Sequence, residues 1–232
     1  MVPDSHALNE IAMGDMRLLS GATTNRVHID MSTVSPLVIK QLERAYLTKQ
    51  ASFLHAPVLG SVPQAAEGSL LIFIGGDRSV TSRYEPIFHA LGRRIWYLEE
   101  ITKASHLKLI YNLFIASMIT ALSEGLVLGQ KTGVPSSTIL EVLKESALGA
   151  PMYQTKGEAI QKRNFTPRFM VAHMLKDLNL IYDAAQSAGV PVSVVSTIRD
   201  LFVAANPRGL QKEDYSAVVK VLEEAAQIEV KD

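Results

Sequence analysis

Short apolar runs alternate with amphipathic segments over the first hundred residues. Strand-length runs lie at Val27–Asp30, Phe53–Val58, Leu70–Ile74 and Ile95–Leu98. The clearest helical pattern between them is capped by Ser35, opened by Pro36 and runs to about Lys49. Further helices are expected from about Ser5 and from about Val80 to Gly92. Strands that alternate with helices predict an α/β domain with a mainly parallel sheet over residues 1–98.

The pattern changes after residue 98, where helical periodicity continues to the end of the chain. Lys103–Lys131 reads as one long helix without a proline, and two later helices are expected at Ala172–Ser187 and Asp214–Gln227. Gly133-Val134-Pro135 and Gly189-Val190-Pro191 each predict a glycine cap followed by a helix with proline among its early residues. An all-helical domain is therefore predicted over residues 99–232, with no strand between residues 110 and 200.

Composition narrows the class of protein. The 232 residues carry 23 basic and 23 acidic side chains, so the formal net charge is zero and no nucleic-acid partner is implied. Cysteine is absent, which excludes disulfides and thiolate metal sites and fits a cytoplasmic location. The six histidines show no metal-ligand spacing, so no metal is expected. Leu109–Leu128 is long enough to span a membrane, but its polar residues, with Glu124 near one end, favour a buried helix of a soluble protein.

Lys108 and Asn112 are the first candidates for chemistry. They stand four residues apart on a largely apolar helix, so both side chains lie on one face. An ammonium and an amide placed together can hold an oxygen-bearing substrate, and the lysine can exchange a proton with it. Spacing alone favours a plainer interpretation, in which the lysine extends along the helix edge beside a hydrogen-bonded asparagine.

Three other segments carry polar groups with two interpretations each. Ser32 and Thr33 follow a predicted strand and could bind a ligand at its carboxyl end or simply cap the next helix. Pro57–Ser61 could present backbone N–H groups to a carboxylate or form an ordinary turn. Lys176-Asp177 could be a functional pair or an exposed one, and because adjacent helix residues point about 100° apart, we expect separate roles for them.

Taken in order, these motifs resemble the β-hydroxyacid dehydrogenase family, which includes 3-hydroxyisobutyrate dehydrogenases and glyoxylate/succinic semialdehyde reductases. The resemblance covers nearly the whole chain and is carried by Asp30-Met31-Ser32-Thr33, Ala56-Pro57-Val58-Leu59-Gly60-Ser61, Lys108 with Asn112, and Lys176-Asp177. It departs from the family pattern at His55, Leu59 and Ser61, where the family often has Asp, Ser and Gly. The fold it implies is a partial Rossmann domain followed by an all-α domain similar to the C-terminal domain of 6-phosphogluconate dehydrogenase.

The resemblance also implies an activity and a set of roles. The activity is hydride transfer between NAD or NADP and a small 3-hydroxyacid or semialdehyde bearing a carboxylate, in a homodimer or homotetramer. Lys108 is implied as the catalytic acid and base. Substrate binding is implied for Ser32, Thr33, Gly60, Ser61 and Asn112, and cofactor binding for Thr33 and Lys176. Asp177 is implied to be structural or to orient its neighbours.

One expected element has no match in this sequence. Family members begin with a G-x-G-x-x-G turn between a strand and a helix, and Gly75-Gly76 is the nearest glycine cluster here. We therefore expect a chain that carries the later part of the nucleotide-binding domain, short of about two βα units, with impaired cofactor binding. The alternative is a non-catalytic helical oligomerisation module derived from such an enzyme.

Overall fold

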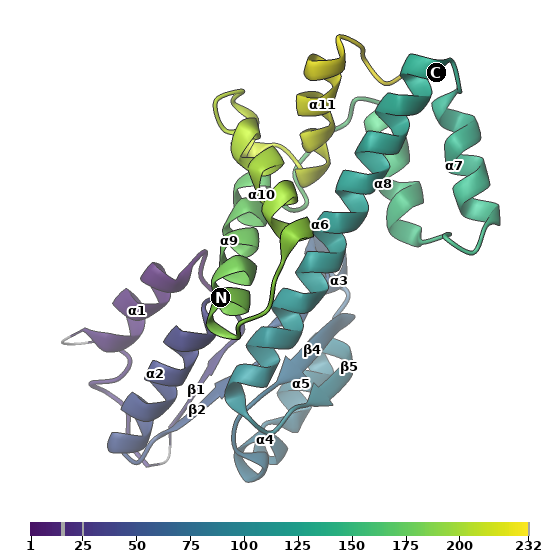
Figure 1. Cartoon of the computed structure of the whole chain (residues 1–232). Coiled ribbons are helices and arrows are strands. Elements are labelled where there is room, and N and C mark those ends of the chain that lie inside the picture. The colour runs from purple at the N-terminus through teal and green to yellow at the C-terminus, as the bar shows by residue number, and fades with distance from the viewer. Residues whose placement is uncertain (15–16, 25, 232) are drawn as a thin grey trace. The chain divides into compact units, whose positions relative to one another are not determined.

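The computed structural model describes residues 1–14, 17–24 and 26–231. It divides into two compact units, Met1–Tyr111 and Asn112–Asp232, and one continuous helix, α6 (Ile101–Thr132), runs through the division. Figure 1 labels the helices and strands of each unit.

The first unit alternates strands and helices, as predicted. Its elements before α6 are α1 (Ser5–Met13), β1 (Val27–Asp30), α2 (Pro36–Thr48), β2 (Ser52–His55), β3 (Val58–Leu59), α3 (Val62–Ala66), β4 (Leu70–Ile74), α4 (Arg78–Arg83), α5 (Glu85–Leu91) and β5 (Gly92–Tyr97). Asp4 caps α1 by accepting the Ala7 N–H at 2.8 Å. The Ser35 hydroxyl caps α2 by accepting the Leu37 N–H, and Pro36 is its first residue. These caps explain why both helices begin where the sequence predicts.

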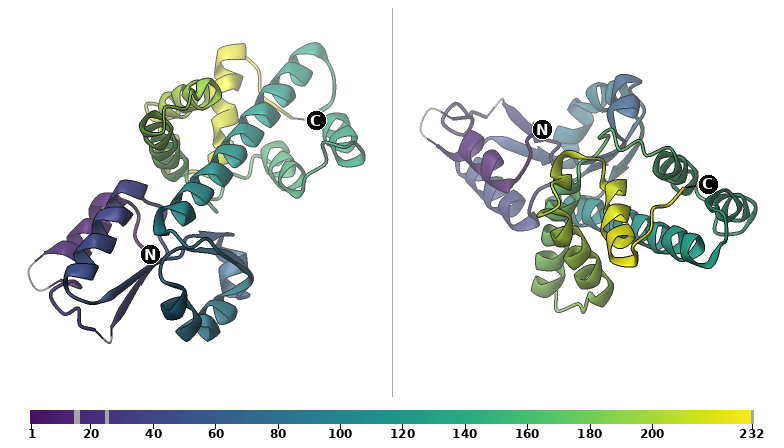
Figure 2. Two further views of the ribbon diagram at one scale, coloured as in Figure 1. Left: turned by 60° about the horizontal axis from the view of Figure 1, so that its bottom comes forward. Right: turned by 90° about the horizontal axis from the view of Figure 1, so that it is seen from above.

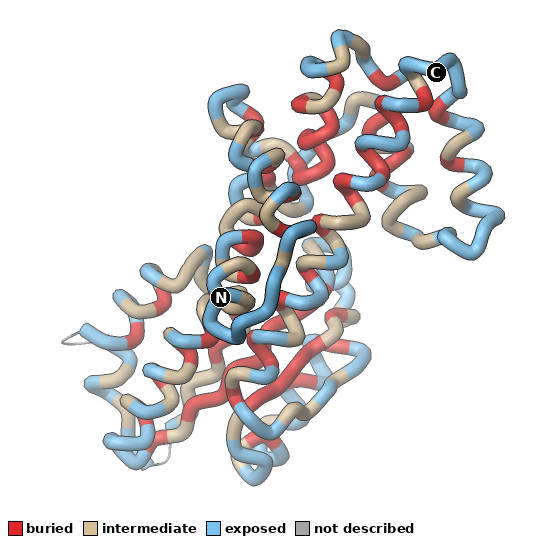
Figure 3. Tube along the Cα trace, viewed as in Figure 1, coloured by how far each residue is buried: buried red, intermediate tan, exposed pale blue. Residues whose placement is uncertain are grey.

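The strands form two small sheets (Figures 1 and 2). β1 and β2 pair in parallel with Asp30 opposite His55, while β4 pairs in parallel with β5 and antiparallel with β3. Among the described residues, two of the three strand pairs are therefore parallel. Helices α1 and α2 pack with β2 around Leu8, Ile39 and Tyr46, and buried positions follow the strands of this unit in Figure 3.

The predicted strand Phe53–Val58 is wrong as a single element. The Ala56 N–H still bonds to the Asp30 carbonyl beside β1 at 2.7 Å, whereas Val58 pairs with Ile72 of β4. Pro57 separates them, since a proline has no N–H to continue a ladder. The chain therefore changes from one sheet to the other at this residue.

The predicted helix from Val80 to Gly92 is also two elements. Helix α4 ends and α5 begins around Tyr84, which serves as the C-cap of one and the N-cap of the other. Pro86 follows in the first turn of α5, where a proline is tolerated, but in a continuous helix its ring would clash with the carbonyl four residues earlier. This proline explains the break.

The second unit is helical after α6. Its elements are α7 (Ser136–Glu145), α8 (Pro151–Gln161), α9 (Val171–Ser187), α10 (Ser193–Ala205), the 3-10 turns η1 (Leu210–Lys212) and η2 (Tyr215–Val218), and α11 (Val219–Ala226). No strand lies between residues 110 and 200, all of which are described.

Three helix starts in this unit differ from prediction. Pro135 is the N-cap of α7 and Pro191 lies two residues before α10, so neither is inside a helix. The predicted helix Asp214–Gln227 opens with the 3-10 turn η2, because the Asp214 carboxylate accepts the Ser216 N–H at 3.1 Å and tightens that turn.

Candidate functional site

A buried polar cluster lies where β1 and β2 end. The Asp30 carboxylate accepts hydrogen bonds from the Ser32 hydroxyl at 2.7 Å, the Ser32 N–H at 3.1 Å and Nδ1 of His55 at 3.0 Å. All three residues are buried. Because β1 and β2 are parallel neighbours, their carboxyl ends meet at one edge of the sheet, where open α/β sheets bind ligands.

The charge of Asp30 is stabilised by these contacts. Burial works to raise the pKa of the Asp30 carboxyl, but hydrogen bonds from His55 and Ser32 hold that pKa below its ordinary value. The carboxylate accepts and cannot donate, so His55 must carry a proton on Nδ1. Asp30 thus fixes both Ser32 and the tautomer of His55.

The hydroxyl of Ser32 already makes two hydrogen bonds within the protein. Besides donating to Asp30, its hydroxyl accepts the Val2 N–H at 2.8 Å. Its role toward a substrate carboxylate stays a prediction, and what the geometry shows is an anchor for the turn that carries Thr33, which is half-buried. The far end of that turn is held as well, because the Ser35 N–H bonds to the Ser5 hydroxyl at 3.0 Å.

Gly60 and Ser61 form the turn between β3 and α3. Gly60 has φ +128°, and a Cβ there would lie 2.7 Å from Leu70 Cδ2, so the position requires glycine. The Ser61 N–H donates to the Gln64 side-chain oxygen at 2.9 Å. The predicted backbone cradle stays a prediction, because in this structure the segment is a turn whose Ser61 N–H already has an internal acceptor.

Lys108 lies in the second turn of α6 and is half-buried. Its neighbour Leu107 packs against Leu59, Phe73 and Ala104, which fixes this part of the helix on the sheet of the first unit. Asn112 follows one helical turn later, so the predicted pair stands at adjacent positions along a single helix.

Asn112 is held by a buried acid on α9. Its amide donates to Oδ2 of Asp177 at 2.5 Å, and both side chains are buried. Oδ1 of the same carboxylate lies 2.8 Å from Nζ of Lys176, which is one-quarter exposed. Asp177 therefore joins two of the predicted site residues, Asn112 and Lys176.

The expectation of separate roles for Lys176 and Asp177 stays a prediction, although the two side chains are paired. Their Cα–Cβ bonds diverge, but the lysine side chain is long enough to bring its ammonium back to the adjacent carboxylate. Sequence reasoning also assigned no role to Asp30. A carboxylate at the end of a predicted strand, followed after Met31 by Ser32 and Thr33, was the available signal.

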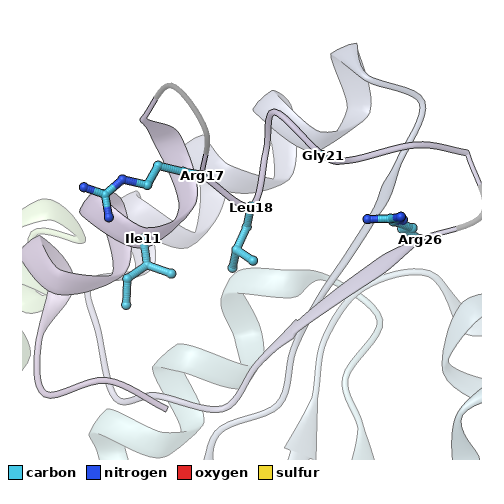
Figure 4. A pocket seen from close by; sticks show the side chains of 5 residues that line it. All are labelled: Ile11, Arg17, Leu18, Gly21 and Arg26. Atoms are coloured by element: carbon cyan, nitrogen blue, oxygen red, sulfur yellow. The ribbon is translucent and has the colours of Figure 1, made fainter.

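A surface hollow of about 370 Å³ lies elsewhere in the first unit (Figure 4). Ile11, Leu18 and Gly21 line it together with two arginines, Arg17 and Arg26. None of the predicted site residues lines it. In Figure 4 the side chains of Arg17 and Arg26 lie on opposite sides of Leu18 and do not converge on a shared point.

The pyrophosphate of a dinucleotide requires free N–H groups at a helix start. Side chains of the protein already cap two helix starts of the first unit: Ser35 caps α2, and Asp77 caps α4, where its carboxylate accepts the Ser79 N–H at 2.7 Å. Gly75 is packed against α6, since a Cβ there would lie 2.7 Å from Ile101 Cα. These residues do not fit a pyrophosphate.

A metal site and a membrane span are the two other features that this composition raises. Within the described ranges, no group of three or more histidine and acidic side chains is placed to hold a metal ion. Helix α6 is long and apolar enough to cross a membrane, but by length and composition only, and buried core helices of soluble proteins share both properties.

Comparison with known families gives matches to both halves of the chain. A family described as the NAD binding domain of 6-phosphogluconate dehydrogenase matches residues 1–99. A second, described as NAD-binding of NADP-dependent 3-hydroxyisobutyrate dehydrogenase, matches residues 102–222.

Curated relatives and a solved structure agree with these matches. Glyoxylate/succinic semialdehyde reductase 2 (chloroplastic) of Arabidopsis thaliana is 31% identical over 229 residues, which are 97% of this chain and 63% of that protein. Reductase 1 of the same plant is 32% identical, and the match covers 96% of this chain and 77% of that protein. The 3-hydroxyisobutyrate dehydrogenase of Mycobacterium tuberculosis, solved with L-serine, has the same fold with a TM-score of 0.86 and 24% identity, over 96% of this chain and 77% of its own.

Proposed function

This chain belongs to the β-hydroxyacid dehydrogenase family of NAD(P)-dependent enzymes, and we propose that it exchanges hydride between NAD(P) and a small 3-hydroxyacid or a small carboxylate-bearing aldehyde. The observation that carries the proposal is the placement of Lys108 one turn before Asn112, whose amide is fixed by Asp177. The carboxylate-bearing aldehydes named for the Arabidopsis relatives, glyoxylate and succinic semialdehyde, are the substrates we favour.

Lys108 is the proton carrier in this proposal. During reduction its ammonium donates a proton to the oxygen that becomes an alkoxide, and during oxidation the neutral amine accepts that proton. The cofactor, when bound, supplies or accepts the hydride.

Asn112 is proposed to orient the reacting oxygen, because Asp177 leaves its amide in one position. The Nδ2 group of Asn112 carries two N–H donors, and one of them donates to Oδ2 of Asp177. The second can donate to an aldehyde oxygen, whereas the carbonyl oxygen of Asn112 can only accept, as from the hydroxyl of a hydroxyacid. Lys176, paired to the same carboxylate, is proposed to face substrate and cofactor.

The carboxylate of the substrate is proposed to bind at the ends of β1 and β3. Thr33 and the turn anchored by Ser32 form one side, and the Gly60–Ser61 turn forms the other. For the Ser61 N–H to take part, Gln64 must give up its hydrogen bond, so we expect this loop to adjust on binding.

The proposal is tested by aldehyde-dependent oxidation of NADH and of NADPH. Glyoxylate and succinic semialdehyde are each supplied with cofactor at millimolar concentration, because the described residues do not provide a pyrophosphate cradle. Cofactor oxidation that depends on aldehyde supports the function. Binding of aldehyde without any turnover supports the alternative, a module that keeps assembly and has lost catalysis.

We also infer that the helical unit forms a homo-oligomer. One face of α6 carries Phe114, Ala121, Gly125 and Leu128, all exposed, with Phe114 at 56% and Leu128 at 65%. An apolar and small-residue helix face of this kind suits packing against a second copy of the chain. Light scattering at micromolar concentration tests this, and a monomeric mass contradicts it. Cytoplasmic location stays a prediction.

A further inference from the structure

The side chain of His55 has an environment that the proposed reaction does not use. It is wholly buried at the end of β2, Nδ1 donates to Asp30, and Nε2 has no hydrogen-bond partner. A buried polar atom without a partner costs about 1–3 kcal/mol. Among the contacts described, the ring of His55 is therefore held through Nδ1 and Asp30.

The backbone of His55 lies at the junction of the two sheets of the first unit. In the β1–β2 pair, His55 stands opposite Asp30. Its N–H donates to the Gly75 carbonyl at 3.1 Å, and its carbonyl accepts the Gly75 N–H at 2.9 Å. The ring is therefore held on a rigid support beside the carboxylate.

The cluster is not a nucleophilic triad. The Ser32 hydroxyl donates to Asp30 and not to His55, and Ser32 is completely buried. Both side chains instead converge on one carboxylate, which accepts three hydrogen bonds. The arrangement orients groups and does not activate an oxygen.

We propose that His55 is a positioning residue that acts through Asp30 on the Ser32–Thr33 turn and so sets the affinity for the substrate carboxylate. The Nδ1–H bond neutralises part of the Asp30 charge and fixes the carboxylate plane. With that plane fixed, one oxygen takes the Ser32 hydroxyl while the other takes the Ser32 N–H. Because Thr33 is the next residue, its position depends on both bonds.

Position 55 holds histidine in this chain, where the family often has aspartate. An aspartate there would place two carboxylates in contact, whereas histidine supplies a donor to Asp30. The proposal therefore concerns a feature of this chain, and it rests on the proposed function.

The test compares four variants with the wild type. His55→Asn keeps a donor at the place of Nδ1, His55→Gln moves the donor toward the place of Nε2, and His55→Leu removes it. His89→Leu is the matched control, since His89 is exposed on α5 and contacts only the exposed Glu85 among the contacts described. Stability of each variant is measured by urea unfolding, so that affinities are compared only between folded proteins.

Two readouts separate this proposal from the proposed function. The first is the Kd for succinic semialdehyde without cofactor, followed through the amide resonances of Ser32 and Thr33. The second is the split between KM and kcat in aldehyde reduction. We expect His55→Leu and His55→Gln to raise Kd and KM about tenfold or more, as loss of a buried charge-assisted hydrogen bond implies, with kcat little changed. His55→Asn should restore most of the affinity, and His89→Leu should match the wild type.

Each outcome decides the matter. If the wild type binds the aldehyde and His55→Leu weakens that binding, the positioning role of His55 is supported. If no NADPH is oxidised at the same time, only the proposed function fails. If His55→Leu is folded and binds with wild-type Kd, or His55→Asn gives no rescue, positioning by His55 is refuted. A wild type that binds no aldehyde refutes both.

Discussion

Replacing Asp177 by asparagine perturbs the buried contact that joins α6 to α9. In the wild type, one carboxylate oxygen accepts the Asn112 amide and the other lies beside the Lys176 ammonium. An amide at residue 177 has one acceptor and one donor. In either orientation, its NH₂ group meets a second donor, from Asn112 or from Lys176.

The expected loss in the free energy of unfolding follows from the burial of each partner. A hydrogen bond to a charged group contributes about 1.5–3 kcal/mol, and Asn112 is almost completely buried. The Lys176 pair is one-quarter exposed, so it adds only about 0–1 kcal/mol. The total is about 1.5–4 kcal/mol, which for a chain of this size lowers Tm by roughly 3–16 °C.

The assay is urea unfolding followed by circular dichroism, with Asp183→Asn on the same helix as the control, because Asp183 is exposed. The double variant Asn112→Asp with Asp177→Asn exchanges amide and carboxylate and should regain at least half of the loss. Wild-type stability for Asp177→Asn, or a double variant less stable than the sum of the two single changes, would refute the reasoning.

Three further predictions concern packing, pH and the cofactor. Gly157→Ala should destabilise the chain by about 1–3 kcal/mol, since its Cβ would lie 2.7 Å from Leu140 Cδ1; Leu140→Val should recover part of this, and a variant as stable as the wild type contradicts it. The pKa of Asp30 is lower in the fold, so its contribution to stability is full above the ordinary value of 3.8 and is lost as the pH falls through the folded pKa. The difference in the free energy of unfolding between the wild type and Asp30→Asn should therefore become smaller below about pH 4. Acid-unfolding curves that stay parallel would disprove this. Calorimetric titration of the purified chain should show no saturation by NADH or NADPH at micromolar concentrations, and micromolar affinity would mean that other residues hold the phosphates.

Much of the fold follows from local signals. Ser35-Pro36 predicts the start of α2, and the apolar runs at residues 27–30 and 70–74 match β1 and β4. The errors arise where proline or a nearby side chain overrides periodicity. Pro57 transfers the chain between sheets, Pro86 splits a helix, and Asp214 tightens the first turn of the last one.

The site was less accessible to sequence reasoning because its contacts join distant residues. Asn112 and Asp177 meet across 65 positions, and His55 meets Asp30 across 25. The motifs indicated which segments carry polar side chains with a chemical role. They did not indicate that the Ser32 hydroxyl donates to the carboxylate of Asp30, two residues earlier. Such pairings depend on strand register and helix packing, which periodicity does not specify.

The most direct test of the account is the turnover of Lys108→Ala in aldehyde reduction at millimolar NADPH. Loss of a general acid lowers kcat about 10²–10⁴-fold, and we expect that loss here with cofactor affinity unchanged. Lys103→Ala, which removes an exposed lysine from the first turn of the same helix, should turn over like the wild type. A Lys108→Ala variant with wild-type kcat would contradict the assignment of Lys108 as the proton carrier.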